Sequence, residues 1–239
     1  MHSCLDRLRI EGQYAVNLLD LPRREVPKSF LAESNQPLRP LFRRGLRYDE
    51  DSASQVQAFV AASELHLKEA DRLVAERYGW RGYRVPSIDP CRRDVTGLTG
   101  PYLTLLSIAS VQTMGTVTLG LDSAAGLFAD QLYRDWIDPL RAQGRRVCEL
   151  VRLAIRPGTN FRIVLDSLLD VAYYFGRVLH GATDLVVEVN PSHVPIYRRL
   201  VGFSILGEEK VCPRVGAPSV LLVVSAERLS SALGLAGSS

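Results

Sequence analysis

The feature that most constrains the fold is a short, almost continuous apolar stretch at residues 147–155 (VCELVRLAI). Such a run, with β-branched residues at several positions, predicts a strand covered on both faces. Glu149 and Arg152 interrupt it, and a buried charge is costly unless it is paired. A regular strand would point these two side chains to opposite faces, whereas a one-residue bulge would bring them onto one face. A structural ion pair and a functional site both remain open.

The flanking segments predict a mixed sheet with helices. A strand at 147–155, a helix at 161–179 and a strand at 184–189 should form a right-handed parallel crossover. Further strands are expected at 55–62, 103–110, 113–121, 204–211 and 219–224, and helical segments at 64–77, 126–140 and 190–203. The order favours one α/β or α+β domain at residues 53–228.

The two ends of the chain are expected to be less regular. Residues 1–52 carry several prolines and no long periodic stretch, which predicts a poorly ordered or loosely packed arm. Residues 229–239 are expected to form a flexible tail.

Composition excludes several classes of protein. A net charge of +3 is too mild to imply nucleic-acid binding. The four cysteines lack zinc or disulfide spacing, and the four histidines show no metal-ligand spacing, so no metal is expected. Cys148 and Cys212 are expected to be small core residues. Without a signal-peptide pattern or a long apolar run, a cytoplasmic location and no membrane span are expected.

The stretch from Asn190 to Phe203 resembles a helix of the GNAT acyltransferases. Tyr197 follows Asn190 by seven residues, and Gly202-Phe203 comes five residues later. In that superfamily the tyrosine often lies near the thioester sulfur and acts as a general acid. The resemblance implies this role for Tyr197, with packing in the core as the alternative.

A closer resemblance covers roughly residues 55–225. Separate segments in the same order are similar to the bacterial N-acyl amino acid synthases: RYGWRGY at 77–83, TLGLDS at 118–123, RVCELVRLA at 146–154, EVNPSHV at 188–194 and CPRV at 212–215. These enzymes move a long acyl chain from acyl carrier protein to the α-amine of an amino acid such as tyrosine. Their relatives, the acyl-homoserine-lactone synthases, share a Glu-x-x-Arg that Glu149 and Arg152 match. The resemblance implies a GNAT-like mixed central sheet flanked by helices.

The turn at residues 156–162 departs from the usual GNAT pattern. GNAT enzymes that use coenzyme A hold its pyrophosphate with a loop of N–H groups at a helix start. Here the turn has one glycine, and Pro157 removes a donor. Acyl-phosphopantetheine on acyl carrier protein is therefore the expected donor, with no separate cofactor. An acidic carrier could dock on paired arginines, for which solvated surface is the alternative: Arg145, Arg146, Arg198 and Arg199.

Amide formation requires a neutral amine, which is mostly protonated at pH 7. Glu149 is the candidate general base, because burial should raise its pKa. Main-chain N–H groups near residues 152–155 could bind the oxyanion. Arg152 could orient Glu149 or hold the amino acid carboxylate. Further substrate-binding candidates are Trp80, Arg81, Asn190 and His193, of which the Trp80 loop could instead pin a helix end and His193 could be structural.

Three other functions stay open. One is a coenzyme A-dependent GNAT acetyltransferase, and another is a GNAT-like domain that binds an acyl ligand without turning it over. The third is an acyl-homoserine-lactone synthase, although the Cys-Pro-Arg and Trp-Arg-Gly-Tyr segments favour amino acid acylation.

Overall fold

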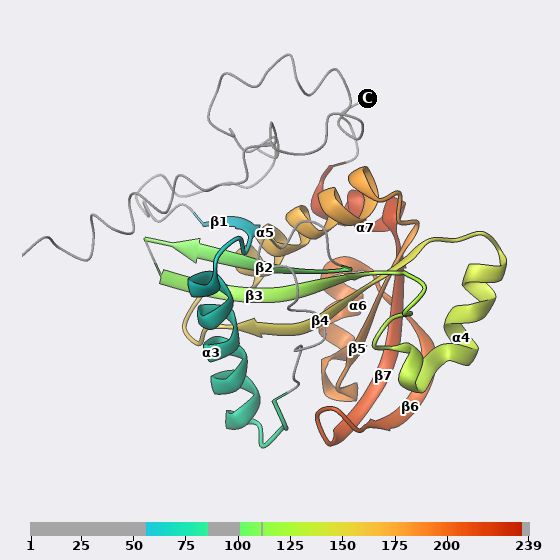
Figure 1. Cartoon of the computed structure of the whole chain (residues 1–239), viewed down its shortest axis with the longest axis horizontal. Coiled ribbons are helices and arrows are strands. Elements are labelled where there is room, and N and C mark those ends of the chain that lie inside the picture. Colours follow the sequence, from blue (N-terminus) through green and yellow to red (C-terminus); the bar gives the residue numbers. More distant parts are fainter. Residues whose placement is uncertain (1–55, 86–100, 111, 236–239) are drawn as a thin grey trace, which may run out of the picture.

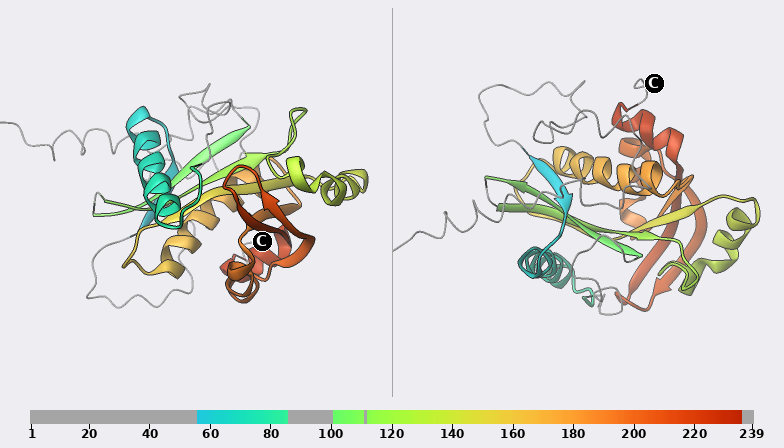
Figure 2. Two further views of the ribbon diagram at one scale, coloured as in Figure 1. Left: turned by 90° about the horizontal axis from the view of Figure 1, so that it is seen from below. Right: turned by 45° about the horizontal axis from the view of Figure 1, so that its top comes forward.

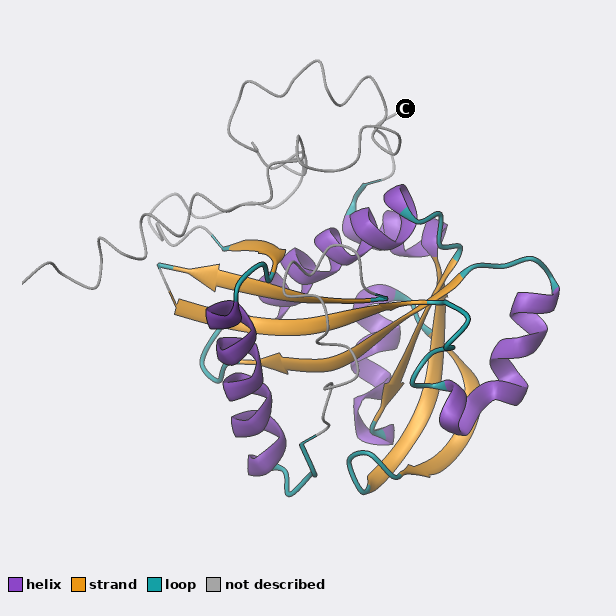
Figure 3. Cartoon of the chain, in the orientation of Figure 1, coloured by secondary structure: helices purple, strands orange, loops and turns teal. Residues whose placement is uncertain are grey.

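The computed structural model describes residues 56–85, 101–110 and 112–235. Within these residues a seven-stranded sheet has the order β1-β2-β3-β4-β5-β7-β6, with helices on both faces (Figures 1 and 3). The strands are β1 (Gln57–Val60), β2 (Tyr102–Ala109), β3 (Gln112–Leu121), β4 (Val147–Ile155), β5 (Asp184–Val189), β6 (Ser204–Cys212) and β7 (Ala217–Ser225). The helices are α3 (Glu64–Trp80), α4 (Asp130–Ala142), α5 (Phe161–Tyr173), its π-helical continuation η3 (Tyr174–Leu179), η4 (Pro191–His193), α6 (Val194–Val201) and α7 (Ala226–Leu233).

The predicted mixed sheet and parallel crossover are confirmed. β4 pairs with β5 in parallel, and the remaining neighbours in the sheet are antiparallel. The stretch chosen from its apolar pattern is β4 itself, in the centre of the sheet.

β4 has two different halves. Its pairing with β3 reaches Ile155, but its pairing with β5 covers only Val147 to Leu150. Figure 1 shows β5, β7 and β6 turning away from β1–β4. We call the region where β4 leaves β5, beyond Leu150, the splay. There the edge of β4 that faces β5 has main-chain polar groups without a ladder partner in β5.

The predicted bulge lies at the start of the splay. Arg152 and Leu153 together oppose a single residue of β3, Val117, and Arg152 has a left-handed φ of 58°. Because residues paired across strands point to the same face, Glu149 shares its face with Ala154, which packs on α3. Arg152 also reaches α3, so the bulge brings both charges to one face, as expected.

Different helices cover the two faces of the sheet. α3 and α5 lie on opposite sides of the sheet (Figure 2). On the α5 side, leucines of the helix pack against the central strands in the larger core: Leu165, Leu168 and Leu169 against Val117, Leu119 and Leu150. On the other side α4 forms a smaller core in which Tyr133 and Ile137 meet Val147, Val186 and Leu221.

Two sequence predictions need correction. Residues 229–235 are not a flexible tail, because α7 continues to Leu233 and buries Leu229 against the larger core. Ser225 caps the start of this helix, and Gly234 ends it in a left-handed conformation. The helical segment predicted at residues 126–140 is α4, which begins only at Asp130 and continues through Pro139 to Ala142. Residues 1–52, the predicted arm, lie outside the described residues.

The described cysteines behave as predicted. Cys148 and Cys212 are both free and buried. Among the helices that the structure describes, none combines the length and apolar character needed to cross a lipid bilayer.

Candidate active site

Glu149 is buried in the face of the sheet that α3 and α4 cover. Only 1% of its surface is exposed. Its carboxylate accepts hydrogen bonds from the amides of Phe128 (2.7 Å) and Ala129 (3.0 Å), in the loop at residues 122–129 that joins β3 to α4. Tyr102 contributes a longer bond of 3.4 Å from β2. The side chain is thus held from two elements.

Gly120 leaves the space that Glu149 occupies. A Cβ at this position would lie 2.8 Å from Cγ of Glu149 and equally close to the ring of Tyr102. Any larger residue would therefore have to displace the carboxylate or the ring.

The environment of Glu149 brings its titration into the neutral range. Burial raises its pKa to about 7, because desolvation disfavours the charged carboxylate more than the two amide bonds favour it. The positive charge of Arg214 acts like the amide bonds and lowers the pKa of Glu149, whereas the negative charge of Glu188 raises it. A carboxyl group with a pKa near the working pH is well suited to accept and release a proton.

Arg152 is held by α3. Its Nη2 donates a hydrogen bond of 2.8 Å to Oδ1 of Asp71, which forms a salt bridge with only 4% of the arginine side chain exposed. A left-handed conformation in a residue with a Cβ costs about 1–3 kcal/mol and is concentrated at functional sites. The strained backbone aims this guanidinium toward α3, and the hydrogen bonds of Glu149 come from other groups.

The end of α3 meets the loop between β5 and α6 beside the splay. Nη1 of Arg81 lies within hydrogen-bond distance of Nε2 of His193, and Asn190 donates to the Tyr83 hydroxyl at 3.0 Å. Burial and the Arg81 charge both lower the pKa of His193. The structure thus brings together three of the predicted substrate-binding residues, Arg81, Asn190 and His193.

Trp80 differs from these neighbours. Its surface is 74% exposed, and its ring is flanked by the guanidinium groups of Arg77 and Arg81. The structure therefore leaves Trp80 on the surface, and its role in substrate binding stays a prediction.

Tyr197 lies on the α5 side of the splay. Its ring contacts Phe203 edge-on at 5.7 Å and lines a small apolar cavity with Leu150 and Leu153 of β4. Burial raises its pKa, as it raises that of Tyr78 on α3 to about 12. The Tyr78 hydroxyl also raises the pKa of Tyr197, and the Arg152 charge lowers the pKa of Tyr78. At neutral pH Tyr197 keeps its proton and could donate it.

The sequence profile of the family described as N-acyl amino acid synthase FeeM matches residues 69–225, well over half of the chain. The chain belongs to this family. No curated protein sequence gives a significant match.

Solved structures confirm the fold of this acyltransferase. The N-acyl amino acid synthase FeeM from uncultured soil microbes is 22% identical, with a TM-score of 0.64 over 76% of this chain and 95% of that one. The acyl-homoserine-lactone (AHL) synthase LasI is 16% identical, with a TM-score of 0.51 over 75% and 95%. A probable acetyltransferase from Staphylococcus epidermidis is 12% identical, with a TM-score of 0.50 over 72% and 99%. The predicted GNAT-like fold is therefore correct.

The structure describes all four predicted docking arginines. Arg145 and Arg146 directly precede β4, and Arg145 is bonded to the buried carboxylate of Asp184. Arg198 and Arg199 are exposed on α6, and the carbonyl of Gly202 after this helix accepts a hydrogen bond from Arg228 at the start of α7. The role of the four arginines in docking stays a prediction.

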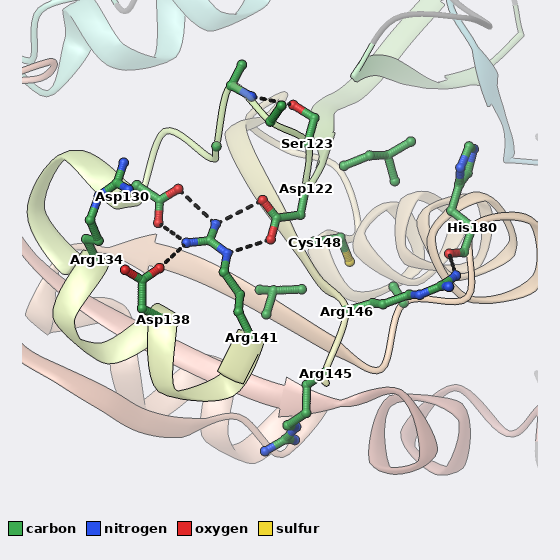
Figure 4. Close-up of a pocket in the computed structure, with 16 residues that line it drawn as sticks. Asp122, Ser123, Asp130, Arg134, Asp138, Arg141, Arg145, Arg146, Cys148 and His180 are labelled. Atoms are coloured by element: carbon green, nitrogen blue, oxygen red, sulfur yellow. Dashed lines mark hydrogen bonds and ion pairs between the residues drawn. The ribbon is translucent and has the colours of Figure 1, made fainter. Parts of the chain in front are cut away.

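A cleft of about 620 Å³ lies beside α4, at the end of the sheet where β4 begins (Figure 4). At its centre Arg141 donates hydrogen bonds to three aspartates, one in the loop before α4, one at the start of α4 and one near its end: Asp122, Asp130 and Asp138. Asp130 in turn accepts the amide of Leu127 at 2.7 Å. These ion pairs fix the loop that holds Glu149. Across the described parts of the chain, no cluster of side chains could hold a metal ion.

Sequence analysis missed three charged residues of the site: Asp71, Glu188 and Arg214. Glu188 and Arg214 stand in segments that the resemblance includes, at 188–194 and 212–215. Nothing local in the sequence indicates that they contact each other, as they do here, or that either lies near Glu149.

Proposed function

We propose that this acyltransferase moves a long-chain fatty acyl group from acyl carrier protein to the α-amine of a tyrosine-like amino acid. The observation that carries the proposal is the position of Glu149. This buried carboxyl group, with a pKa of about 7, shares a face with Arg152 just before β4 separates from β5.

The acceptor would bind on the α3 face. The guanidinium of Arg152, steadied by Asp71, can bind the α-carboxylate of the amino acid. The α-amine then points along β4 toward Glu149, which removes its proton directly or through one water molecule. A neutral amine is thereby presented to the thioester.

Acyl transfer follows at the splay. The amine nitrogen attacks the thioester carbonyl carbon, and the C=O electrons move to oxygen as the tetrahedral intermediate forms. Main-chain N–H groups at the bulge of β4 can bind this oxyanion. The intermediate then collapses to the amide and breaks the C–S bond: its nitrogen releases its extra proton to water, and Tyr197 donates its proton to the departing thiolate. Proton exchange with water then returns Tyr197 and Glu149 to their starting states.

A layer of apolar side chains lies beside Tyr197. The small cavity beside Tyr197 is lined by aliphatic and aromatic side chains from β4, α5 and the end of α6: Leu150, Leu153, Leu165, Leu168, Leu169, Val201 and Phe203. An acyl chain entering between β4 and β5 would meet these groups and leave water, which favours a fatty donor.

The turn before α5 supports a carrier-protein donor. The Asn160 side chain already accepts the amide of Ile163, its carbonyl accepts the amide of Val164, and Pro157 has no amide proton. Pro157 thus removes one donor from the turn that would hold a pyrophosphate, whereas phosphopantetheine carries a single phosphate. Exposed Arg198 and Arg199 lie near this turn and suit an acidic protein surface. Such a donor would place the reaction in the cytoplasm.

A product search tests the proposal. Purified protein is incubated with long-chain acyl carrier protein and a mixture of amino acids, and N-acyl amino acids are measured by mass spectrometry. Acyl-coenzyme A is supplied in parallel, and Glu149→Gln serves as a control. Product from the carrier protein alone, lost in the variant, supports the proposal. Product from coenzyme A alone contradicts the donor, and no product from either donor contradicts the proposed substrates.

A further inference from the structure

Arg214 holds the other side of the loop that holds Glu149. Its Nη1 donates to the Phe128 carbonyl at 2.8 Å and to the Gln131 side chain at 2.9 Å, and its guanidinium lies 5.8 Å from the centre of the Phe128 ring. Its Nη2 donates to the Glu188 carboxylate on β5. Arg214 therefore ties the turn between β6 and β7 to the start of α4 and to the sheet.

One peptide group connects Arg214 with Glu149. The Phe128 carbonyl and the Ala129 amide belong to the same planar unit, in which C=O and N–H point in opposite directions. Arg214 holds the carbonyl, and the amide donates to Oε2 of Glu149 at 3.0 Å. Fixing the carbonyl therefore fixes the direction of the amide, and a charged donor on the oxygen strengthens the N–H as a donor.

Glu188 is in turn held in place. Its side chain is 9% exposed, and its Oε2 accepts from Ser219 at 3.4 Å. Ser219 also interacts with the Tyr133 hydroxyl of α4. Arg214 is thus one member of a buried polar network under α4 and has little freedom to move.

We propose that Arg214 is a positioning residue that orients the Phe128–Ala129 peptide toward Glu149 and keeps this carboxylate in its working place and charge state. The catalytic consequence rests on the proposed function, in which Glu149 is the base. The orientation itself rests only on the hydrogen bonds and can be tested without turnover.

The charges around Glu149 set the expected direction of the effect. The titratable and charged groups that face it are Tyr102 on β2, Glu188 on β5 and Arg214 after β6, while the α4 side supplies amides. Arg214 favours the ionised form and Glu188 opposes it. Removing Arg214 takes away a positive charge and leaves the negative charge of Glu188 unpaired. Both effects should raise the pKa of Glu149.

The test is a carboxyl ¹³C NMR titration of the full chain with labelled glutamate. Glu149→Gln assigns the Glu149 signal. Arg214→Gln should raise the Glu149 midpoint by about one pH unit or more. The double variant Arg214→Gln with Glu188→Gln should shift it less, because the uncompensated carboxylate is gone. Arg214→Lys keeps the charge and provides a readout if Arg214→Gln fails to fold.

Lys210 offers a matched control. It also joins the β6–β7 hairpin to α4, through a 2.9 Å bond to the Leu132 carbonyl and a contact with the Trp136 ring, but it does not touch the peptide that binds Glu149. Lys210→Met should leave the Glu149 midpoint unchanged. An equal shift in the Lys210 and Arg214 variants would overturn the proposal, since it would reflect loosening of α4 in general.

Kinetics separate this inference from the proposed function. If Glu149 is the base, Arg214→Gln should lower kcat by 10-fold or more at pH 7, with little change in the KM of the amino acid. Unchanged Glu149 titration in both Arg214 variants would refute the positioning role, whatever the activity. Wild-type activity in Glu149→Gln would instead refute the base, and a shifted titration would still support the positioning role.

Discussion

The two halves of β4 hold their buried charged residues with different partners. In the half paired on both sides, Glu149 sits in regular strand geometry and accepts hydrogen bonds from the amides of a loop. In the half paired only with β3, Arg152 adopts a strained left-handed conformation and takes a carboxylate partner from α3. One strand thus supplies a group that can change its charge and a group that remains charged.

The difference shows how a sheet can serve as both scaffold and site. Strong pairing holds Glu149 where water is scarce, and this burial is what brings its pKa to about 7. Beyond Leu150 the main-chain groups of β4 have no ladder partner in β5, and the bulge turns Arg152 back to the same face as Glu149. Substitutions in the two halves of β4 should therefore have different effects.

The largest effect is expected from the paired half. Glu149→Gln keeps the shape of the side chain but cannot accept a proton at neutral pH. Because general base catalysis contributes about 10²–10⁴-fold, kcat/KM for the amine should fall by at least 100-fold at pH 7.5, measured by product formation. Glu208→Gln on the exposed surface of β6 is the control and should retain full activity.

A change in the splayed half should act on binding. Arg152→Lys keeps a positive charge but loses the planar fork that suits a carboxylate. A hydrogen bond to a charged group is worth about 1.5–3 kcal/mol, so the KM of the amino acid should rise roughly 10- to 100-fold. An effect on kcat alone, with unchanged KM, would show that Arg152 does not bind the amino acid.

A methyl group can test the space around Glu149. In Gly120→Ala the new Cβ would press on Glu149 and on the Tyr102 ring, so stability should fall by about 1–3 kcal/mol and activity by about 10-fold. Chemical denaturation and initial rates measure the two effects. Gly79→Ala in α3 adds the same methyl group where no atom lies within 4 Å. It should leave activity unchanged and raise stability by about 0.5–1 kcal/mol, because alanine favours a helix more than glycine does.

The smallest effect is expected at the docking surface. Reversing Arg198 and Arg199 to glutamate should raise the KM of acyl carrier protein by about fivefold at low salt, since exposed ion pairs contribute little individually. Activity with the acyl group on free pantetheine should be unchanged.

The sequence was most informative where local pattern decides the structure. The bounds of β4 and β5 follow from their apolar runs, and the bulge follows from the need to place two buried charges. Helix α7 could have been predicted as well, because Ser225 and Gly234 mark its two ends. Only its short length made it resemble a tail.

The partners of the charges could not be predicted. Asp71 is 81 positions from Arg152, and Arg214 is 26 positions from Glu188, so no spacing rule connects them. Exposure is equally hard to infer, since Trp80 is on the surface while the nearby Tyr83 contacts Asn190. Tertiary packing, rather than local sequence, determines these contacts.

The measurement that tests the central claim most directly is the pH dependence of kcat/KM, expressed per protonated amine, for wild type and Glu149→Gln. A carboxyl group with a pKa of about 7 is protonated below that pH and cannot act as a base. The wild-type value should therefore fall as pH decreases through 7 and level off above it, and the variant should be much lower and show no break near pH 7. A wild-type profile without a break between pH 5 and 9, or a variant that keeps the break near pH 7, would contradict the role of Glu149.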